Sequence, residues 1–169
     1  WLTGLILYNK INSDSETLSV KLIQPNISLK QKWNGNPVEN LNKIISLSSD
    51  NSDKNTDLII WPESALPSYF FNSNLKQIHK IRNILGSKTK LITGTTTFDK
   101  KTSKVYNSIV YMSNKDNIDY YNKIQLVPMA EYVPWSNIFS FLGDLNLGQA
   151  NFSKGQSFNL FNYEQFKFG

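Results

Sequence analysis

In the stretch DLIIWPESALP, residues 57–67, a short apolar run ends at a proline that is followed by an acidic residue. Apolar residues at 58–61, with polar sequence before them and Pro62 after them, are typical of a short strand that is buried on both faces. Glu63 then stands at the end of this strand, and strand ends in α/β folds hold side chains rigidly at the mouth of a cleft. A carboxylate there is either a capping group or a catalytic acid or base, and this stretch alone leaves both interpretations open.

A helix is predicted upstream of this strand, in residues 36–48. Asn36 suits the N-cap, Pro37 suits the first helical position, and Glu39 is placed to close a capping box with the N-cap. Apolar residues then recur at helical spacing, which predicts that one face of this helix packs on the domain core.

The remaining segments predict an α/β domain. Alternating apolar and polar residues predict strands, and apolar residues three and four apart predict helices. Helices alternating with strands, followed by a hairpin, are typical of helices packed on a sheet with an added antiparallel portion. The further predicted elements are a strand at 18–24, a helix at 73–85, a strand at 90–98, a hairpin at 104–123, a short helix near 136–142 and two strands around a turn at 158–168.

The composition excludes several classes of function. With 40% hydrophobic and 13% aromatic residues, the 169-residue chain is expected to fold as a globule and not to be disordered. The net charge is +5, but all basic residues except Arg82 are lysines spread along the sequence, so a nucleic-acid partner is not expected. The absence of Cys excludes disulfides and thiol chemistry within these residues, and the lone His79 is interpreted as a solvated residue.

Three motifs carry the candidate chemistry: WPESALP with Glu63, YYNKIQLVP with Lys123, and AEYVP with Glu131. Each of them alone has a structural explanation, such as an exposed acid or a solvated lysine at a sheet edge. Their order and spacing together resemble the nitrilase or carbon–nitrogen hydrolase superfamily, which uses a Glu, Lys and Cys triad in that chain order. Within it, these motifs and the upstream IQPNISLKQKW (residues 23–33) resemble the apolipoprotein N-acyltransferase family most closely.

The resemblance implies a nitrilase-like α-β-β-α sandwich and a set of site residues. It implies that Glu63 is the general base, that Lys123 stabilises the tetrahedral intermediate, and that Glu131 positions Lys123 and the substrate. Trp33 and Tyr132 match positions near the substrate, although Trp33 could equally be a core or rim aromatic. No cofactor and no metal are implied.

The resemblance also implies what surrounds the domain. Residues 18–169 correspond to the N-terminal portion of the nitrilase-like domain, and residues 1–17 to the end of a transmembrane segment and a linker. The nucleophile is expected in a Cys-Tyr-Glu motif a few residues beyond Gly169, so the chain is expected to be an inactive fragment by itself. The implied enzyme lies in the bacterial inner membrane with this domain on the periplasmic side, and transfers a fatty acyl group from phospholipid to the N-terminal diacylglyceryl-cysteine of an apolipoprotein.

Two alternatives and one departure remain. A soluble nitrilase-type amidase would use the same Glu63 and Lys123 with water as the acceptor, and a non-catalytic module that binds anionic membrane surfaces would use neither. The family loop before the second glutamate usually reads Leu-Val-Pro-Phe-Gly-Glu, whereas this chain has Met129 and Ala130. The alanine matters only if that position needs a positive φ.

Overall fold

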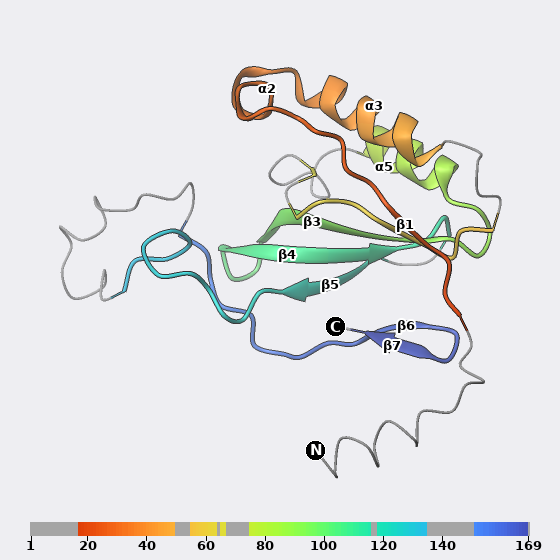
Figure 1. The fold of residues 1–169 in the computed structure, drawn as a ribbon. Coiled ribbons are helices and arrows are strands. Elements are labelled where there is room, and N and C mark those ends of the chain that lie inside the picture. The colour runs from red at the N-terminus through yellow and green to blue at the C-terminus, as the bar shows by residue number, and fades with distance from the viewer. Residues whose placement is uncertain are drawn as a thin grey trace, which may run out of the picture.

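A five-stranded sheet with helices on one face forms the centre of the computed structural model (Figure 1). The structure describes residues 17–49, 55–63, 65–66, 75–115, 118–134 and 151–168. The predicted α/β class is confirmed. The elements in chain order are β1 (Val20–Leu22), α2 (Leu29–Asn34), α3 (Pro37–Ser48), β2 (Leu58–Ile60), α5 (Leu75–Ile84), β3 (Lys90–Asp99), β4 (Lys104–Met112), β5 (Asp119–Asn122), β6 (Phe161–Tyr163) and β7 (Phe166–Phe168).

The sheet has the strand order β1-β2-β3-β4-β5. The first three strands are parallel, with Ile59 of β2 opposite Lys21 of β1 and Leu91 of β3. Parallel neighbours need a crossover connection, and the helices between these strands supply it. The predicted hairpin continues the sheet, because β4 runs antiparallel to β3 and β5 antiparallel to β4. β5 therefore runs in the same direction as β2, and the carboxyl ends of these two strands lie at the same end of the sheet.

The predicted start of α3 is confirmed. The Asn36 side chain accepts a hydrogen bond from the Val38 N–H at 2.9 Å, and Pro37 occupies the first helical position. The predicted capping box is wrong, because Glu39 Oε1 meets the Asn36 side-chain amide at 3.5 Å instead of the N-cap backbone.

A capping box does occur one helix earlier, in the six-residue α2, which the sequence analysis did not predict. Ser28 is its N-cap, and the Gln31 side chain returns the bond to the Ser28 backbone. A helix this short shows too little of the 3.6-residue period to be recognised from apolar spacing.

The strand that precedes Glu63 is anchored in the core between the sheet and the helices. Trp61 is 3% exposed, and its indole N–H donates to Ser48 Oγ of α3 at 2.8 Å. The Ser48 hydroxyl in turn donates to the Ile44 carbonyl at 2.8 Å, so the buried polar atoms are satisfied. The predicted burial of this strand on both faces is confirmed by Leu58 and Ile59, at 4% and 3% exposure. The core on this face includes Leu41, Ile44, Ile59, Trp61, Ile78, Ile81, Leu85, Leu91 and Met112.

The β6–β7 hairpin covers the opposite face of the sheet (Figure 1). Tyr111 of β4 stacks on Phe161 of β6 with ring centroids 5.1 Å apart. The Tyr163 hydroxyl donates to Asp57 Oδ1 at 2.8 Å, and Asp57 also accepts the Ser19 N–H. Burial and the neighbouring Asp57 raise the pKa of Tyr163 to about 12. This bond ties the hairpin to the start of β2. The antiparallel pairing of β6 with β7 confirms the two strands around a turn that were predicted within residues 158–168.

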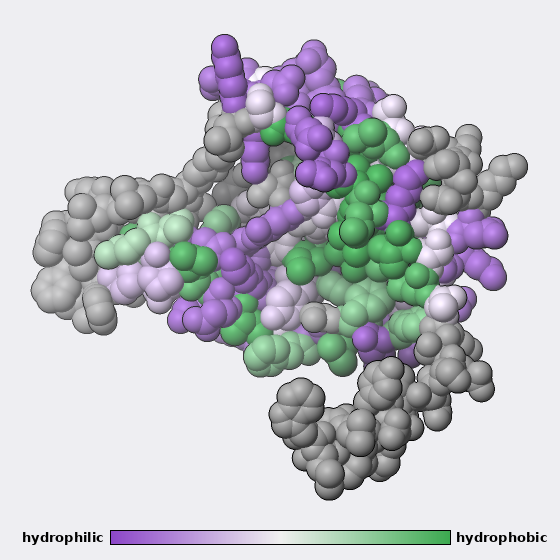
Figure 2. Space-filling view, viewed as in Figure 1, coloured by the Kyte–Doolittle hydropathy of each residue, from purple (hydrophilic) through white to green (hydrophobic). Residues whose placement is uncertain are grey.

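The side chains of β1, the edge strand of the sheet, are largely exposed in the part of the chain that the structure describes. Hydrophobic surface gathers below the helices along β1 (Figure 2), and Leu22 of β1 is 73% exposed. Among the described residues, none of the helices combines the length and the apolar composition that crossing a bilayer requires. Residues 1–17 were predicted to be the end of a transmembrane segment and a linker, and all of them except residue 17 lie outside the described residues, as does the predicted helix near 136–142.

Candidate active site

Glu63 lies in the turn that follows β2, with its side chain exposed. The backbone before it is fixed, because the Trp61 N–H donates to the Ile92 carbonyl of β3 at 2.9 Å. The turn then passes directly over Gly94 of β3. A Cβ at Gly94 would overlap the Glu63 carbonyl group and would lie 2.6 Å from the Glu63 Cα. The position of Glu63 therefore depends on the missing side chain at residue 94.

Lys123 follows β5 directly and is held by its backbone on both sides. Its N–H donates to the Asn107 carbonyl of β4 at 2.8 Å, and its carbonyl accepts the Gly155 N–H at 2.9 Å. The ammonium group donates to Glu131 Oε1 at 2.9 Å, with the Lys123 side chain 35% exposed and the Glu131 side chain 14% exposed. Among the described residues, the ion-pair partner of Lys123 is therefore Glu131 and not Glu63.

The loop of residues 126–131 closes on itself around the Glu131 carboxylate. The Val127 N–H donates to Glu131 Oε2 at 2.8 Å, and the Glu131 N–H donates back to the Val127 carbonyl at 2.9 Å. Met129 has a φ of 64°, a conformation that is unfavourable for a residue with a Cβ, whereas Ala130 has a negative φ. The departure at Ala130 therefore causes no strain, and the strained position is its neighbour.

The segment 152–155 contacts the backbone of both Glu131 and Lys123. The Phe152 N–H donates to the Glu131 carbonyl at 2.8 Å, and the Gly155 N–H reaches Lys123. A Cβ at Gly155 would overlap the Asn122 carbonyl oxygen, so this close approach requires glycine.

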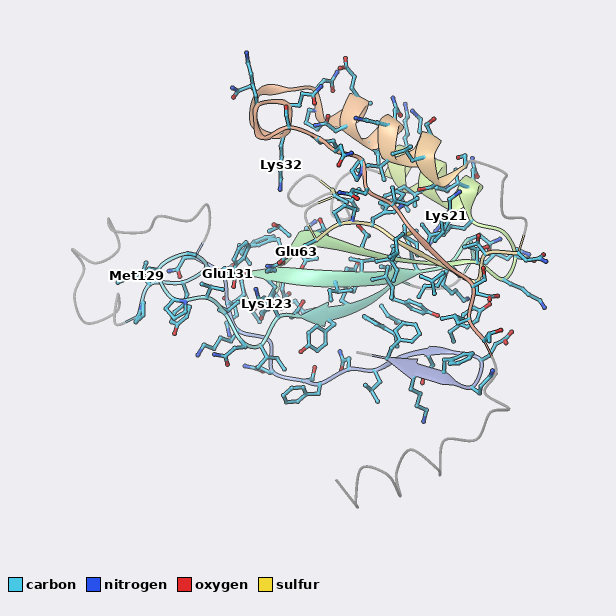
Figure 3. All side chains as sticks on the ribbon, in the orientation of Figure 1. Lys21, Lys32, Glu63, Lys123, Met129 and Glu131 are labelled. Carbon is cyan, nitrogen blue, oxygen red and sulfur yellow. The ribbon has the colours of Figure 1, made fainter. Side chains whose placement is uncertain are left out.

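Asn107 of β4, which the sequence analysis did not single out, connects the acidic residues. Its side-chain nitrogen Nδ2 lies 3.2 Å from Glu63 Oε1 and 2.9 Å from Glu131 Oε1. Glu63, Lys123 and Glu131 thus gather at one end of the sheet (Figure 3). Two features could have pointed to Asn107: it lies in the predicted hairpin, and an amide is the neutral group that can serve two carboxylates.

The two carboxylates differ in their surroundings. Burial by itself raises the pKa of Glu131, but the hydrogen bonds from Val127, Lys123 and Asn107 and the charge of Lys123 outweigh it and hold this pKa below its usual value. All of these donors stabilise the ionised form, so Glu131 is poorly suited to accept a proton. Glu63 is exposed and, within the described part of the chain, accepts a hydrogen bond from Asn107 alone.

A stability difference between the unsubstituted protein and Glu131→Gln should depend on pH. Above about 4.3, the usual pKa of an unfolded glutamate, ionised Glu131 contributes its full stabilisation, and this is lost as the pH falls through the lower folded-state pKa. We expect the variant to be less stable at pH 7 by about 1–3 kcal/mol, and the difference to shrink between pH 5 and pH 3. Urea unfolding at several pH values measures it.

The matched control for this comparison is Glu39→Gln, because the Glu39 side chain is exposed on α3. Its free energy of unfolding should stay within about 0.5 kcal/mol of the unsubstituted protein at every pH. A pH-independent difference for Glu131→Gln would show that its carboxylate charge is not what stabilises the loop.

Of the two predicted substrate-binding residues, Tyr132 lies in the loop that carries Glu131. Tyr132 follows Glu131 and its carbonyl accepts the Met129 N–H at 2.8 Å, while Lys154 Nζ lies 5.1 Å from the centre of its ring. Trp33 lies in α2, and its side chain is outside the described residues. In the part of the chain that the structure describes, no three His, Cys, Asp or Glu side chains gather as a metal site would require.

Comparison with solved structures shows which fold the chain shares. The chain matches a CN-hydrolase superfamily protein from Xanthomonas campestris with a TM-score of 0.56 and 15% identity, over 90% of this chain and 52% of that one. It matches a nitrilase superfamily member from Saccharomyces cerevisiae with a TM-score of 0.51 and 19% identity, over 79% of this chain and 48% of that one. At these identities the likeness establishes the fold alone, and it confirms the expected nitrilase-like fold.

The sequence comparison then shows the family. The family model described as carbon-nitrogen hydrolase matches residues 19–145, and the chain belongs to this family. Similar relatives are the apolipoprotein N-acyltransferases of Haemophilus influenzae (35% identity, 85% of this chain, 29% of the relative), Allorhizobium ampelinum (30%, 87% and 30%) and Aquifex aeolicus (30%, 99% and 39%). The chain thus spans less than two fifths of the length of these relatives.

Proposed function

We propose that this chain is part of a membrane-bound apolipoprotein N-acyltransferase. The observation that carries the proposal is the convergence of Glu63, Lys123 and Glu131 in a chain similar to enzymes of that name. In this proposal residues 18–169 form the N-terminal portion of the catalytic domain, residues 1–17 form the end of a preceding transmembrane segment and a linker, and the nucleophilic cysteine lies outside the 169 residues. The domain faces the periplasm, next to the inner membrane that supplies phospholipid.

The first half-reaction forms a thioester. Glu63 takes the proton of the cysteine thiol, and the sulfur attacks the ester carbonyl carbon of the phospholipid. The tetrahedral intermediate places negative charge on the former carbonyl oxygen, which the Lys123 ammonium stabilises. The carbon–oxygen bond to the lysophospholipid breaks, and the proton held by Glu63 passes to the leaving oxygen.

The second half-reaction transfers the acyl group to an amine. The α-amino nitrogen of the diacylglyceryl-cysteine attacks the thioester carbon, and Glu63 accepts a proton from that nitrogen. The carbon–sulfur bond then breaks, and Glu63 returns the proton to the sulfur, which releases the amide product and restores the thiol. The surroundings of the two acids support this division of roles. Glu131 is saturated by three donors and fixes the Lys123 ammonium, whereas Glu63 keeps an exposed carboxylate that can exchange protons. Trp33 and Tyr132 are proposed to contact the substrate.

The experiment that tests this function uses the full-length polypeptide in membranes and a phospholipid with an alkyne-labelled acyl chain. We expect a hydroxylamine-sensitive label on the protein, and transfer of that label to an added diacylglyceryl-cysteine peptide. Loss of the label to water, with hydrolysis of small amides, would replace the proposal by the amidase alternative. Absence of any label together with binding to anionic vesicles would replace it by the non-catalytic alternative.

A further inference from the structure

Asn107 contacts Glu63, Glu131 and Lys123, through its side chain or its backbone. One nitrogen, Nδ2, donates to Glu63 Oε1 at 3.2 Å and to Glu131 Oε1 at 2.9 Å, and Lys123 Nζ reaches that same Glu131 oxygen at 2.9 Å. The Asn107 carbonyl also accepts the Lys123 N–H at 2.8 Å. Asn107 therefore links Glu63, the proposed base, to the Lys123–Glu131 ion pair.

The chemistry of the amide explains why asparagine suits this place. Two ionised carboxylates repel each other, and an NH₂ group between them offsets this repulsion by offering one N–H to each without adding charge. The same chemistry fixes the orientation of the amide, because its oxygen would face two negative oxygens if the group were reversed. An aspartate at this position would add a third negative charge.

The backbone at Asn107 is held firmly enough to position other groups. Asn107 pairs with Thr96 in the antiparallel ladder between β3 and β4. The next residue, Ser108, is 2% exposed, donates to Asn122 Oδ1 at 2.7 Å and meets Thr97 Oγ1 at 2.6 Å. This row of side-chain hydrogen bonds joins β3, β4 and β5 next to Lys123, which directly follows Asn122.

We infer that Asn107 is a positioning residue, which sets the distance of Glu63 from the Lys123–Glu131 pair by donating one N–H to each carboxylate. The inference rests on the proposed function and adds to it a residue that aligns the base with the group that stabilises the intermediate. Asn107 acts through Glu63 and Glu131, and no contact with the substrate is required of it.

The first test is the rate of acyl-enzyme formation in the full-length protein. Asn107→Ala should lower this rate by about 10–100-fold, because a misplaced base and ion pair lose alignment, while the apparent KM for phospholipid changes less than twofold. If this variant does not fold, Asn107→Ser, which keeps one hydroxyl donor, takes its place with a smaller loss. A rate equal to that of the unsubstituted protein would overturn the inference.

A second readout separates positioning from a general structural role. Asn107→Asp should be the slowest variant at pH 8 and should regain activity relative to Asn107→Ala as the pH falls, because a protonated carboxyl again donates a hydrogen bond. The control Asn159→Asp adds the same charge at an exposed asparagine whose amide donates to the Tyr120 carbonyl. It should keep the unsubstituted pH profile, and equal profiles for the two aspartate variants would contradict the inference.

Thermal unfolding distinguishes failure of this inference from failure of the proposed function. Asn107→Asp should melt roughly 3–6 °C below Asn107→Ala at pH 7, and the gap should close below about pH 4, where an aspartate becomes neutral. If the unsubstituted protein forms no acyl-enzyme, the proposed function fails, and this comparison alone decides whether Asn107 separates two carboxylates. A gap that does not change with pH would contradict that placement.

Discussion

Replacement of Glu63 by glutamine is expected to lower the rate of acyl-enzyme formation by about 10³-fold. Glutamine keeps the length of the side chain, and its carbonyl oxygen can still accept the 3.2 Å hydrogen bond from Asn107. The geometry of the site is therefore retained, while the group that takes the proton of the thiol is lost. Labelling of the full-length protein with an alkyne-bearing phospholipid, followed in time, measures the rate.

Glu39→Gln is the matched control for this measurement, because it makes the same change at an exposed glutamate on α3. It should label at the rate of the unsubstituted protein. The melting temperature of Glu63→Gln should also stay unchanged within a few degrees, since the Glu63 side chain is exposed. Acyl-enzyme formation at the normal rate in Glu63→Gln would disprove the role of Glu63 as the base.

Replacement of Gly94 by alanine is expected to have the largest effect on stability, about 2–3 kcal/mol. The backbone φ of Gly94 is not positive, so alanine fits its conformation, and the cost is purely steric. The added Cβ would lie 2.6 Å from the Glu63 Cα, and the obstructing atoms are backbone atoms that cannot rotate away. The melting temperature should fall by roughly 5–10 °C, and acyl-enzyme formation should fall as well because the Glu63 turn is displaced.

Gly86→Ala provides the control for this substitution. The nearest atom to a Cβ at Gly86 is the Thr89 hydroxyl at 3.1 Å, and a side chain can move by the few tenths of an ångström required. Its melting temperature should change by less than about 3 °C. Equal effects of the two substitutions, or full acylation activity in Gly94→Ala, would show that the turn at Glu63 does not rest on residue 94.

The local pattern of the sequence was sufficient for most of the elements. The buried strand before Pro62, the capped helix at Asn36 and the hairpin at 104–123 were predicted because their apolar periodicity and cap residues are local signals. The short helix α2 was not predicted, and the capping box was assigned to Asn36 and Glu39 instead of Ser28 and Gln31. Both errors concern the first turn of a helix, where too few residues are present for the sequence pattern to identify a short helix or its capping pair.

The α/β class and the candidate residues Glu63, Lys123 and Glu131 could be predicted from the sequence, because apolar periodicity and short motifs in a characteristic order indicate them. The resemblance implied that Glu131 positions Lys123, and the structure adds the contact between them at 2.9 Å. The sequence did not indicate that Asn107, 44 residues from Glu63, lies between the two acids. Only the tertiary structure decided where Asn107 lies and that Gly94 must lack a side chain. Such contacts depend on the register of strands that come from distant parts of the chain. An asparagine or a glycine within a strand shows no local sequence pattern from which its neighbour across the sheet could be predicted.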